Sequence, residues 1–357
     1  MKIGLMAYNL TVHSGQTRFL VNIAMGLKKK GYDVCIYSLG IDEKIKNIFD
    51  NNKICYYAGN FSANIFSKLR MITYNLKLAK KLANIIKAND FMDYYVALQD
   101  EAIPVIKFIK NNDKKYVYIS NGDLSLLFFN QQYMLEYGFL WKYLSYTMVK
   151  RVWNNSKLAS MYDMVLGNSN FTSNIMSFIY NIPVSGYVYP PVDDAFKPTK
   201  YREEKEYCLA ILRNVMEPGY PYIKKLSDKI KIKVVGNASI EGADNLGFVS
   251  EKELIDLYSG AKVTLSINPQ EFYGYTTVES LKCGTPVIAF NNGGAQEIIQ
   301  NNFNGWLFNR KTELMSTAYS IMNHGYDPQV RANALASSKN YSVETSADKL
   351  LYYLNSL

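Results

Sequence analysis

NPQEFYGYTTVESLKCGTPVIA, from Asn268 to Ala289, carries the strongest indication of the fold. It follows an apolar run at 262–267 and predicts a loop, a short helix that stops at Gly284, and a buried strand over 285–290. A strand, loop, helix and strand in this order are typical of a parallel sheet covered by helices.

The same stretch holds two acidic residues, one in each half of the predicted turn. Glu271 lies in the loop beyond the carboxyl end of a strand, where open α/β sheets bind ligands, and Glu279 falls in the following helix. Gly274 lets the backbone approach a ligand, and the amides of Gly274, Tyr275 and Thr276 open a helix whose positive end suits a diphosphate without a metal. We expect Glu279 to accept hydrogen bonds from a ribose diol. Glu271 would orient sugar hydroxyls or stabilise an oxocarbenium-like transition state.

Strand-like runs alternate with helical segments along the whole chain. Strands are expected at 2–8, 33–38, 53–57, 94–98, 115–120, 163–167, 208–212, 231–235, 262–267 and 285–290. The prolines of Tyr189-Pro-Pro-Val-Asp193 break this alternation. We therefore predict an α/β protein of two Rossmann-like, doubly wound domains that face each other across a cleft, the first over 1–197 and the second over 198–340. Residues 341–357 add a C-terminal helix.

Composition limits the class of protein. The chain has 357 residues, of which 48% are hydrophobic and 20% charged, as in folded globular proteins. It contains no apolar run long enough to span a bilayer and no leader with a signal-type apolar region, so we expect a cytoplasmic protein. The four cysteines form no C-x-x-C pair, and with only His13 and His324 present we predict no metal site.

Charge is distributed unevenly along the chain. Residues 1–200 hold 24 Lys and Arg against 14 Asp and Glu, whereas the remainder holds 16 against 17. Such a basic half predicts a surface that faces a membrane, a nucleic acid or an acidic substrate. Within it, the segment 61–88 is expected to be either a core-facing helix with a solvated basic face or a helix that docks on anionic lipid, aided by the aromatic stretch 126–153.

The chain resembles the retaining family-4 glycosyltransferases of the GT-B fold, whose hallmark is two glutamates separated by seven residues before a Gly-Thr-Pro-Val strand. Glu271, Glu279 and the strand after Gly284 match that pattern. The resemblance extends over nearly the whole length. Further matching segments are KIGLMAY with Ser14-Gly15, Asn168-Ser169 with Phe171-Thr172, Tyr189 to Asp193, Asn245 to Val249, Gly293-Gly294 with Glu297, and Asn304 to Leu307.

The resemblance implies a transferase that takes a sugar from a UDP-, GDP- or ADP-sugar, keeps its anomeric configuration and needs no metal or other cofactor. The second domain would bind the donor, through Arg213 on the diphosphate and the backbone near Val249 on the base. The first domain would bind a glycan or lipid-linked acceptor, and Gly15 would approach the substrate. His13 would touch the acceptor, and the last helix would cross back to the first domain.

The sequence departs from the family pattern at three places. Six residues after Arg213 the family has a lysine, but this chain has Gly219, so the cation is missing or comes from Lys224 or Lys225. Where the family has a histidine on the acceptor side, this chain has Asn121 and Asp123; one of them substitutes, or the role is absent. Tyr273 takes the place of an aromatic residue next to Gly274.

Three functions from different classes remain open. The first is a retaining glycosyltransferase, possible at the inner face of a membrane. The second is a non-catalytic relative that binds nucleotide or sugar, because the lysine and histidine are missing. The third is a nucleic-acid-binding protein, which ranks last because no motif of that class is present, and no nucleic acid partner is therefore expected. A sugar-nucleotide epimerase of the same architecture is a further enzymatic alternative.

Overall fold

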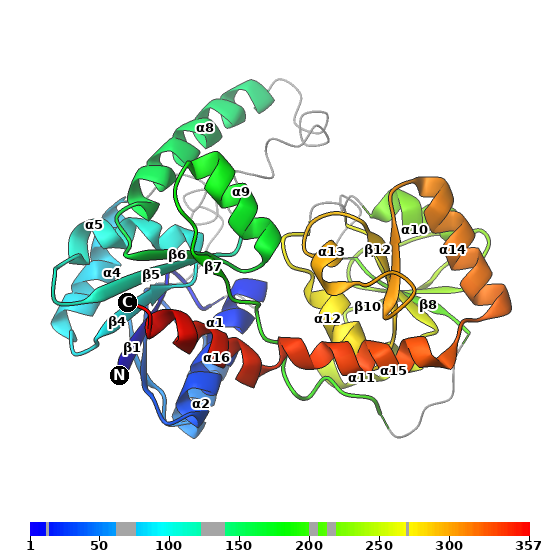
Figure 1. Ribbon diagram of the computed structural model, residues 1–357, viewed down its shortest axis with the longest axis horizontal. Helices are drawn as coiled ribbons and strands as arrows, with labels where there is room; N and C mark the ends of the chain where they lie inside the picture. Colours follow the sequence, from blue (N-terminus) through cyan, green and yellow to red (C-terminus); the bar gives the residue numbers. More distant parts are fainter. Residues whose placement is uncertain (12–13, 62–75, 123–139, 200–205, 213–218, 269–270) are drawn as a thin grey trace. The chain divides into compact units, whose positions relative to one another are not determined.

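The computed structural model describes residues 1–11, 14–61, 76–122, 140–199, 206–212, 219–268 and 271–357, and over 140–149 only the backbone. The chain forms two compact units (Figure 1). Unit 1 comprises Met1–Pro191 together with Ser346–Leu357, and unit 2 comprises Val192–Thr345. The sequence-based divisions after residues 197 and 340, which separate the roles of acceptor and donor binding, stay predictions.

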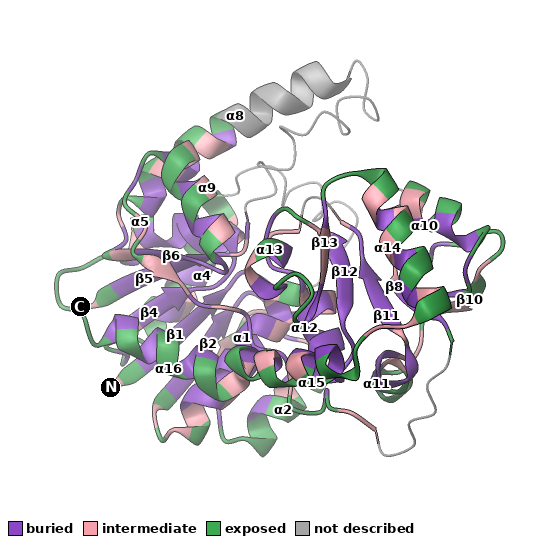
Figure 2. Ribbon diagram, turned by 45° about the vertical axis from the view of Figure 1, so that its right-hand side comes forward, coloured by how far each residue is buried: buried purple, intermediate pink, exposed green. Residues whose placement is uncertain are grey.

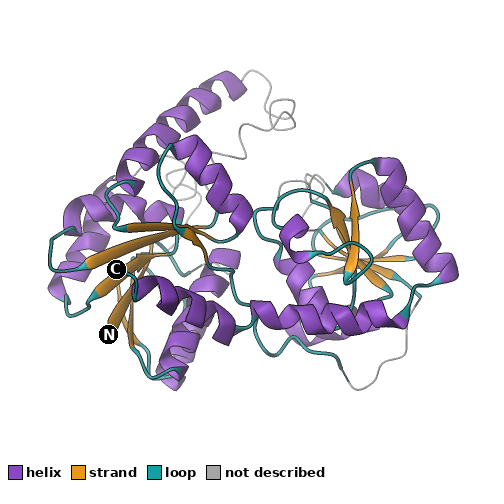
Figure 3. Cartoon of the chain, in the orientation of Figure 1, coloured by secondary structure: helices purple, strands orange, loops and turns teal. Residues whose placement is uncertain are grey.

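Unit 1 is built on one parallel sheet with helices on both faces (Figure 3). Among the described residues its order is β3-β2-β1-β4-β5-β6-β7. The strands are β1 (Lys2–Ala7), β2 (Asp33–Ser38), β3 (Cys55–Ala58), β4 (Tyr94–Ala97), β5 (Lys115–Ser120), β6 (Met164–Gly167) and β7 (Gly186–Tyr187). The helices are α1 (Gly15–Lys29), α2 (Glu43–Asn51), α4 (Leu76–Ala88), η1 (Asp100–Val105), α5 (Ile106–Ile109), α8 (Leu140–Ala159), α9 (Asn170–Tyr180) and α16 (Val343–Leu354).

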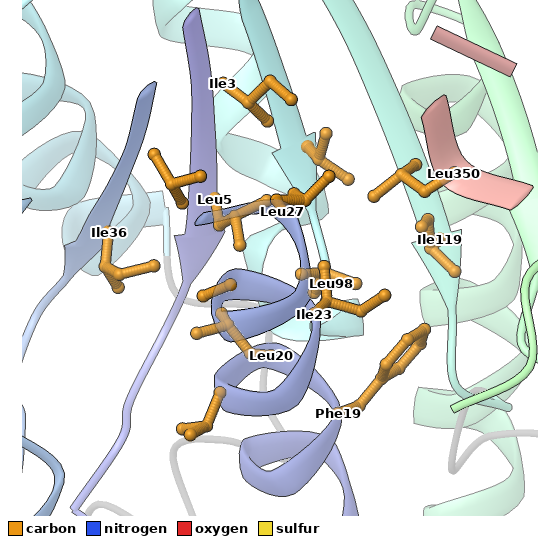
Figure 4. Close-up of a cluster of buried hydrophobic side chains, with 14 of the residues drawn as sticks. Ile3, Leu5, Phe19, Leu20, Ile23, Leu27, Ile36, Leu98, Ile119 and Leu350 are labelled. Carbon is orange, nitrogen blue, oxygen red and sulfur yellow. The ribbon is translucent and has the colours of Figure 1, made fainter. Parts of the chain in front are cut away.

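Alternate residues of the central strands enter two different cores. Ile3 and Leu5 of β1 join one buried cluster, while Met6 joins the cluster on the opposite face of the sheet. Figure 4 shows the first cluster, in which Phe19 and Ile23 of α1 pack over the strands. Because side chains of a strand alternate between faces, strands buried on both sides read as continuous apolar runs in the sequence.

The helix α1 begins at a capped turn directly after the β1 loop. Ser14 is its N-cap, and the side-chain oxygen of Ser14 accepts a hydrogen bond from the Thr17 amide. This bond satisfies one of the amides that a helix start leaves without an intrahelical partner. The cap places Gly15 as the first residue of the helix at the carboxyl edge of the sheet.

The last helix, α16, belongs to unit 1. Leu350 and Leu354 of this helix are fully buried in the cluster that contains β1 and α1. At the surface of the helix, the ammonium of Lys30 lies 2.8 Å from the carboxylate of Asp348. Both chain termini therefore lie in unit 1 (Figure 1).

Unit 2 repeats the architecture with a second parallel sheet. Among the described residues its order is β10-β9-β8-β11-β12-β13. The strands are β8 (Cys208–Ile211), β9 (Ile232–Val235), β10 (Asp244–Gly247), β11 (Val263–Ser266), β12 (Val287–Phe290) and β13 (Gly305–Phe308). The helices are α10 (Tyr220–Ser227), α11 (Glu251–Gly260), α12 (Tyr275–Lys282), α13 (Ala295–Ile298), α14 (Lys311–His324), α15 (Pro328–Ser337) and η2 (Ser338–Tyr341).

The two faces of the second sheet differ in chemistry. One face is apolar, because Leu265 of β11 packs in a cluster with side chains of α10 and α14. The other face carries hydroxyls, since Thr264 and Ser266 of the same strand bond to residues of α12. In Figure 2 the strands β8, β11 and β12 of this sheet are almost entirely buried, whereas the edge strand β10 and the outer sides of α10 and α14 are largely exposed.

The prediction of two Rossmann-like, doubly wound α/β units is confirmed in architecture. Each long strand that the sequence predicts is present, and its ends shift by at most a few residues. The short strands β7 and β13 were not predicted, because β7 is only two residues long and β13 begins with a glycine. Ser169 caps α9, because its side chain accepts a hydrogen bond from the Thr172 amide. Of the expected helix at 61–88, only Leu76–Ala88 lies within the described residues.

Candidate functional site

The helix α12 is held on β11 by a ladder of hydroxyl groups. Thr277 Oγ1 donates to Ser266 Oγ at 3.0 Å, and Ser280 Oγ lies 2.7 Å from Thr264 Oγ1. All four side chains are buried or nearly so, and buried hydroxyls are stabilising only when they are hydrogen-bonded. The ladder therefore fixes the position of α12 relative to the carboxyl end of β11.

Gly274 forms the start of α12 in a conformation that favours glycine. Its φ of 104° lies in the region that side chains rarely adopt. A Cβ at this position would stand 3.5 Å from Glu271 Cγ and 3.3 Å from Thr277 Oγ1. The side chain of Glu271 thus lies beside the first turn, where the amides of Tyr275 and Thr276 begin the helix.

The loop that carries Glu271 is braced by two glycines that follow β12. The Gly294 amide donates to the Glu271 carbonyl oxygen at 2.9 Å. A Cβ on Gly293 would lie 2.1 Å from that same oxygen, and a Cβ on Gly294 would lie 2.2 Å from the Tyr273 carbonyl oxygen. Only glycine allows this approach, so the backbone after β12 fixes the backbone of Glu271. At the side chain, Asn268 Nδ2 donates to Glu271 Oε2 at 3.4 Å.

Glu279 lies on the same helix and is 4% exposed. Its Oε2 accepts a hydrogen bond of 2.9 Å from the hydroxyl of Tyr258 on α11. Burial, reinforced by the Glu279 carboxylate, raises the pKa of Tyr258 well above its usual value. The phenol therefore stays protonated and donates a hydrogen bond to Glu279. A buried carboxylate needs such a bond, because its burial is costly without one.

The structure thus brings Glu271, Gly274, Tyr275, Thr276 and Glu279 into the single connection between β11 and β12. Glu271 lies beside the start of α12, and Glu279 lies one turn further along the same helix, buried against α11. A helix start presents unpaired amides and a partial positive charge, which suits an anionic group such as phosphate. The chemistry of this helix start is therefore compatible with a phosphate group beside Glu271.

No side chain can occupy position 219 without movement of the backbone. A Cβ on Gly219 would lie 2.4 Å from the Ile267 carbonyl oxygen at the end of β11. Lys224 and Lys225 are exposed and lie in the last turn of α10, at the end of that helix away from this edge of the sheet. Their role as a substitute cation stays a prediction. Arg213, the predicted diphosphate ligand, lies outside the described residues.

Val249, the residue predicted to meet the base, follows β10 and is half-buried. Gly247 ends this strand with a φ of 68°, and its carbonyl oxygen accepts from the Gly236 amide at 2.8 Å. Because β10 is at the edge of the sheet, β9 and β8 separate it from β11. All of these strands are parallel, so their carboxyl ends lie at one edge of the sheet.

The acceptor-side candidates fall in unit 1. Gly15 is the first residue of α1, and Asn121 follows β5. The side-chain amide of Asn121 donates to the Leu98 carbonyl oxygen, which ties the ends of β5 and β4 together. His13 and Asp123 lie outside the described residues.

Two polar groups at the site edges were not predicted from the sequence. In unit 1, Gln99 Oε1 accepts from the amides of Tyr8 and Asn9, at 2.7 and 3.1 Å. In unit 2, Tyr258 holds Glu279. Gln99 could have been found from the sequence, because it is a polar residue directly after a predicted strand. Tyr258 follows the segment Asn245 to Val249, which resembles the family's base-binding edge, but its bond to Glu279, 21 residues away, was not predicted.

Within the ranges described, no group of three His, Cys, Asp or Glu side chains could hold a metal ion. The same part of the chain contains no helix long and apolar enough to cross a membrane. The four cysteines are free thiols.

Residues 224–325 match the family of glycosyl transferases group 1. An uncharacterized glycosyltransferase of Haemophilus influenzae is 22% identical to this chain, over 86% of the chain and 85% of that protein. D-inositol 3-phosphate glycosyltransferase of Rhodococcus jostii is 31% identical over 127 residues, which are 32% of this chain and 28% of that enzyme. The chain thus matches less than a third of the length of that enzyme.

Solved structures agree over the full chain. Anabaena Alr3699/HepE, crystallised with UDP, has a TM-score of 0.75 at 17% identity, with 100% of both chains covered. Sucrose-phosphate synthase of Thermosynechococcus elongatus has a TM-score of 0.77 at 12% identity, with 100% of this chain and 98% of that chain covered. The fold is therefore that of the GT-B glycosyltransferases, and the chain carries a glycosyltransferase group 1 segment that includes the β11–α12 connection.

Proposed function

We propose that this protein transfers a sugar from a nucleotide diphosphate sugar to a glycan or lipid-linked acceptor, with retention of anomeric configuration and without a metal. Unit 2 binds the donor and unit 1 the acceptor. The observation that carries the proposal is the position of Glu271 beside the start of α12, with Glu279 on the same helix. Anabaena HepE, of the same fold, has been crystallised with UDP and with UDP-glucose, which supports a nucleotide sugar as donor.

Each group has a distinct role in this proposal. The amides of Gly274, Tyr275 and Thr276 stabilise the charge that develops on the leaving diphosphate, which substitutes for a divalent cation. The carboxylate of Glu271 stabilises positive charge at the anomeric carbon. The carboxylate of Glu279 accepts hydrogen bonds from the ribose hydroxyls and sets the position of the nucleotide.

Donor turnover in EDTA tests this function. The wild type is incubated with UDP-, GDP- and ADP-sugars, and the released nucleotide diphosphate is measured. We expect turnover of one donor in EDTA and a loss of about 100-fold or more in Glu271→Gln, because a charge that stabilises only the transition state is removed. Loss of donor turnover when EDTA removes metal ions would contradict the proposal that transfer needs no metal.

The configuration of the product is tested separately, because retention is a claim about stereochemistry. If the donor is α-linked, retention predicts that proton NMR of the first product formed shows the α anomer. An initial β anomer would contradict retention and leave the transferase activity in place.

One observation favours a non-catalytic relative instead. Position 219, where the family that the sequence resembles has a lysine, is occupied by Gly219, and a Cβ there would lie 2.4 Å from the Ile267 carbonyl oxygen. One diphosphate cation is therefore absent at this position. A protein of this kind would bind the nucleotide and release no product. The turnover measurement decides between the two, since binding without turnover of any of the three donors favours the non-catalytic function.

We also propose that unit 1 contacts an anionic membrane surface at the inner face of a cytoplasmic membrane. In the described part of α4, Ala79, Leu82 and Ile86 are buried, while Lys80, Lys81 and Lys87 are exposed. Attraction of this basic face to acidic lipid is electrostatic, so it weakens as salt rises. Flotation with phosphatidylglycerol vesicles should recover the protein at low salt, and vesicles of phosphatidylcholine alone should not.

A further inference from the structure

Tyr258 connects Glu279 to two other segments of unit 2. Its hydroxyl donates to Glu279 Oε2 at 2.9 Å, and its carbonyl oxygen accepts from Thr285 Oγ1 at 2.6 Å. Its ring packs against that of Phe196, with centroids 6.3 Å apart. Tyr258 itself has no exposed surface, so the phenol has little freedom to move.

The backbone of Tyr258 is held by a buried guanidinium. Arg331 of α15 donates to the Ala261 and Ser259 carbonyl oxygens, at 2.9 and 3.1 Å, at the end of α11. It also donates to Thr285 Oγ1 at 2.9 Å, the same hydroxyl that reaches Tyr258. The end of α11 and Thr285, in the segment after α12, are therefore joined by one network of hydrogen bonds, which restrains the phenol relative to Glu279.

We propose that Tyr258 is a positioning residue, which holds the carboxylate of Glu279 in the orientation that receives the ribose hydroxyls of the donor. This inference rests on the proposed function. Thr276 lies one helical turn before Glu279 and its side chain also interacts with the Tyr258 hydroxyl, so the phenol sits against the face of α12 that carries the predicted donor ligands. Without the Tyr258 hydroxyl, the Glu279 carboxylate can rotate. Its oxygens then no longer point at the ribose hydroxyls, and the hydrogen bonds to the ribose become weaker.

The variant Tyr258→Phe tests the inference, with Tyr207→Phe as matched control. Tyr207 is also a buried phenol of unit 2, and its hydroxyl donates to the Leu257 carbonyl oxygen of α11 at 2.8 Å. Binding of UDP, GDP and ADP and of their 2′-deoxy forms is measured by calorimetry, and melting temperature is measured alongside. Both variants remove one buried hydroxyl from the surroundings of α11, so both should melt at a lower temperature.

The two variants should differ in binding. We expect the Kd of the bound ribonucleotide to rise roughly five- to tenfold in Tyr258→Phe and to stay unchanged in Tyr207→Phe. The rise should shrink with the 2′-deoxynucleotide, because part of the ribose contact is then already lost. In turnover, KM for the donor should rise while kcat changes little.

Other results would overturn the inference. Unchanged binding by Tyr258→Phe, or equal loss in Tyr207→Phe, would show that the phenol is only structural. If Tyr258→Phe does not fold, Thr285→Val removes the bond to the Tyr258 backbone, and unchanged binding by that variant would also contradict the inference. If Glu279→Gln binds nucleotide as the wild type does, the proposed function fails at the ribose contact and this inference fails with it. If Glu279→Gln loses binding and Tyr258→Phe does not, this inference alone is wrong.

Discussion

The amide of Gly294 and the carbonyl oxygen of Glu271 are joined by a hydrogen bond of 2.9 Å, which ties the segment after β12 to the loop before α12. Gly293 packs against the same oxygen so closely that a Cβ would lie 2.1 Å from it. The position of the proposed catalytic carboxylate is therefore determined by a backbone contact made more than twenty residues later in the chain. The predictions below follow from this and related contacts.

The variant Gly293→Ala should destabilise the protein and abolish donor turnover. Gly293 has a φ of 64° and no space for a Cβ, so alanine introduces both backbone strain and overpacking, about 2 to 4 kcal/mol in total. Gly325→Ala is the control, because Gly325 has a φ of 74° with nothing within 4 Å of its Cβ. That variant should lose about 1 to 2 kcal/mol and keep its turnover. Urea unfolding measures the stability of the two variants, and donor turnover measures their activity. Equal activity of the two variants would contradict the role of the contact.

The variant Gly219→Lys should not supply a phosphate ligand. Its Cβ would lie 2.4 Å from the Ile267 carbonyl oxygen, so the backbone must shift and stability falls by about 1 to 3 kcal/mol. Calorimetry measures the affinity for the nucleotide diphosphate that the wild type binds, and urea unfolding measures the stability. Tighter nucleotide binding with unchanged stability would show that the site can accept a lysine.

The variant Arg331→Met should unfold unit 2 at lower denaturant concentration. It removes donors to Ser259, Ala261 and Thr285, and bonds to a charged group contribute about 1.5 to 3 kcal/mol. Methionine keeps much of the side-chain volume, so the loss reports on hydrogen bonding more than on packing. Urea unfolding followed by circular dichroism checks this, and a free energy of unfolding equal to that of the wild type would refute it.

The first turn of α11 should give unit 2 a part of its stability that depends on pH. Hydrogen bonds from the Ser250 hydroxyl and amide hold the pKa of Glu253 below its usual 4.5. A carboxyl whose pKa is lowered on folding stabilises the fold above the unfolded pKa, and this contribution is lost as the pH falls through the folded pKa. Glu253→Gln should therefore unfold more easily than the wild type at pH 7 and by a smaller margin at about pH 3. Glu241→Gln, which removes an exposed carboxyl outside this cap, is the matched control, and an equal change in both variants would count against the cap.

Sequence patterns predicted the fold well because its signals are local. The apolar runs that become β1 and β11 are buried on both faces, and the helices α1 and α12 lie where apolar periodicity and glycines indicate them. The short helix α12 was predicted because Gly274 and Gly284 flank it. The contacts of Gly219 with Ile267 and of Tyr258 with Glu279 could not be predicted, since each depends on how separate elements pack.

Binding of nucleotides to the wild type and to Glu279→Gln in EDTA tests the central claim most directly. Calorimetry with UDP, GDP and ADP should show one nucleotide bound by the wild type without a metal. We expect the Glu279→Gln variant to bind it about 10- to 100-fold more weakly, because a hydrogen bond to a charged group is lost. Equal affinity of the two proteins, or no binding of any of the three nucleotides to the wild type, would contradict the claim.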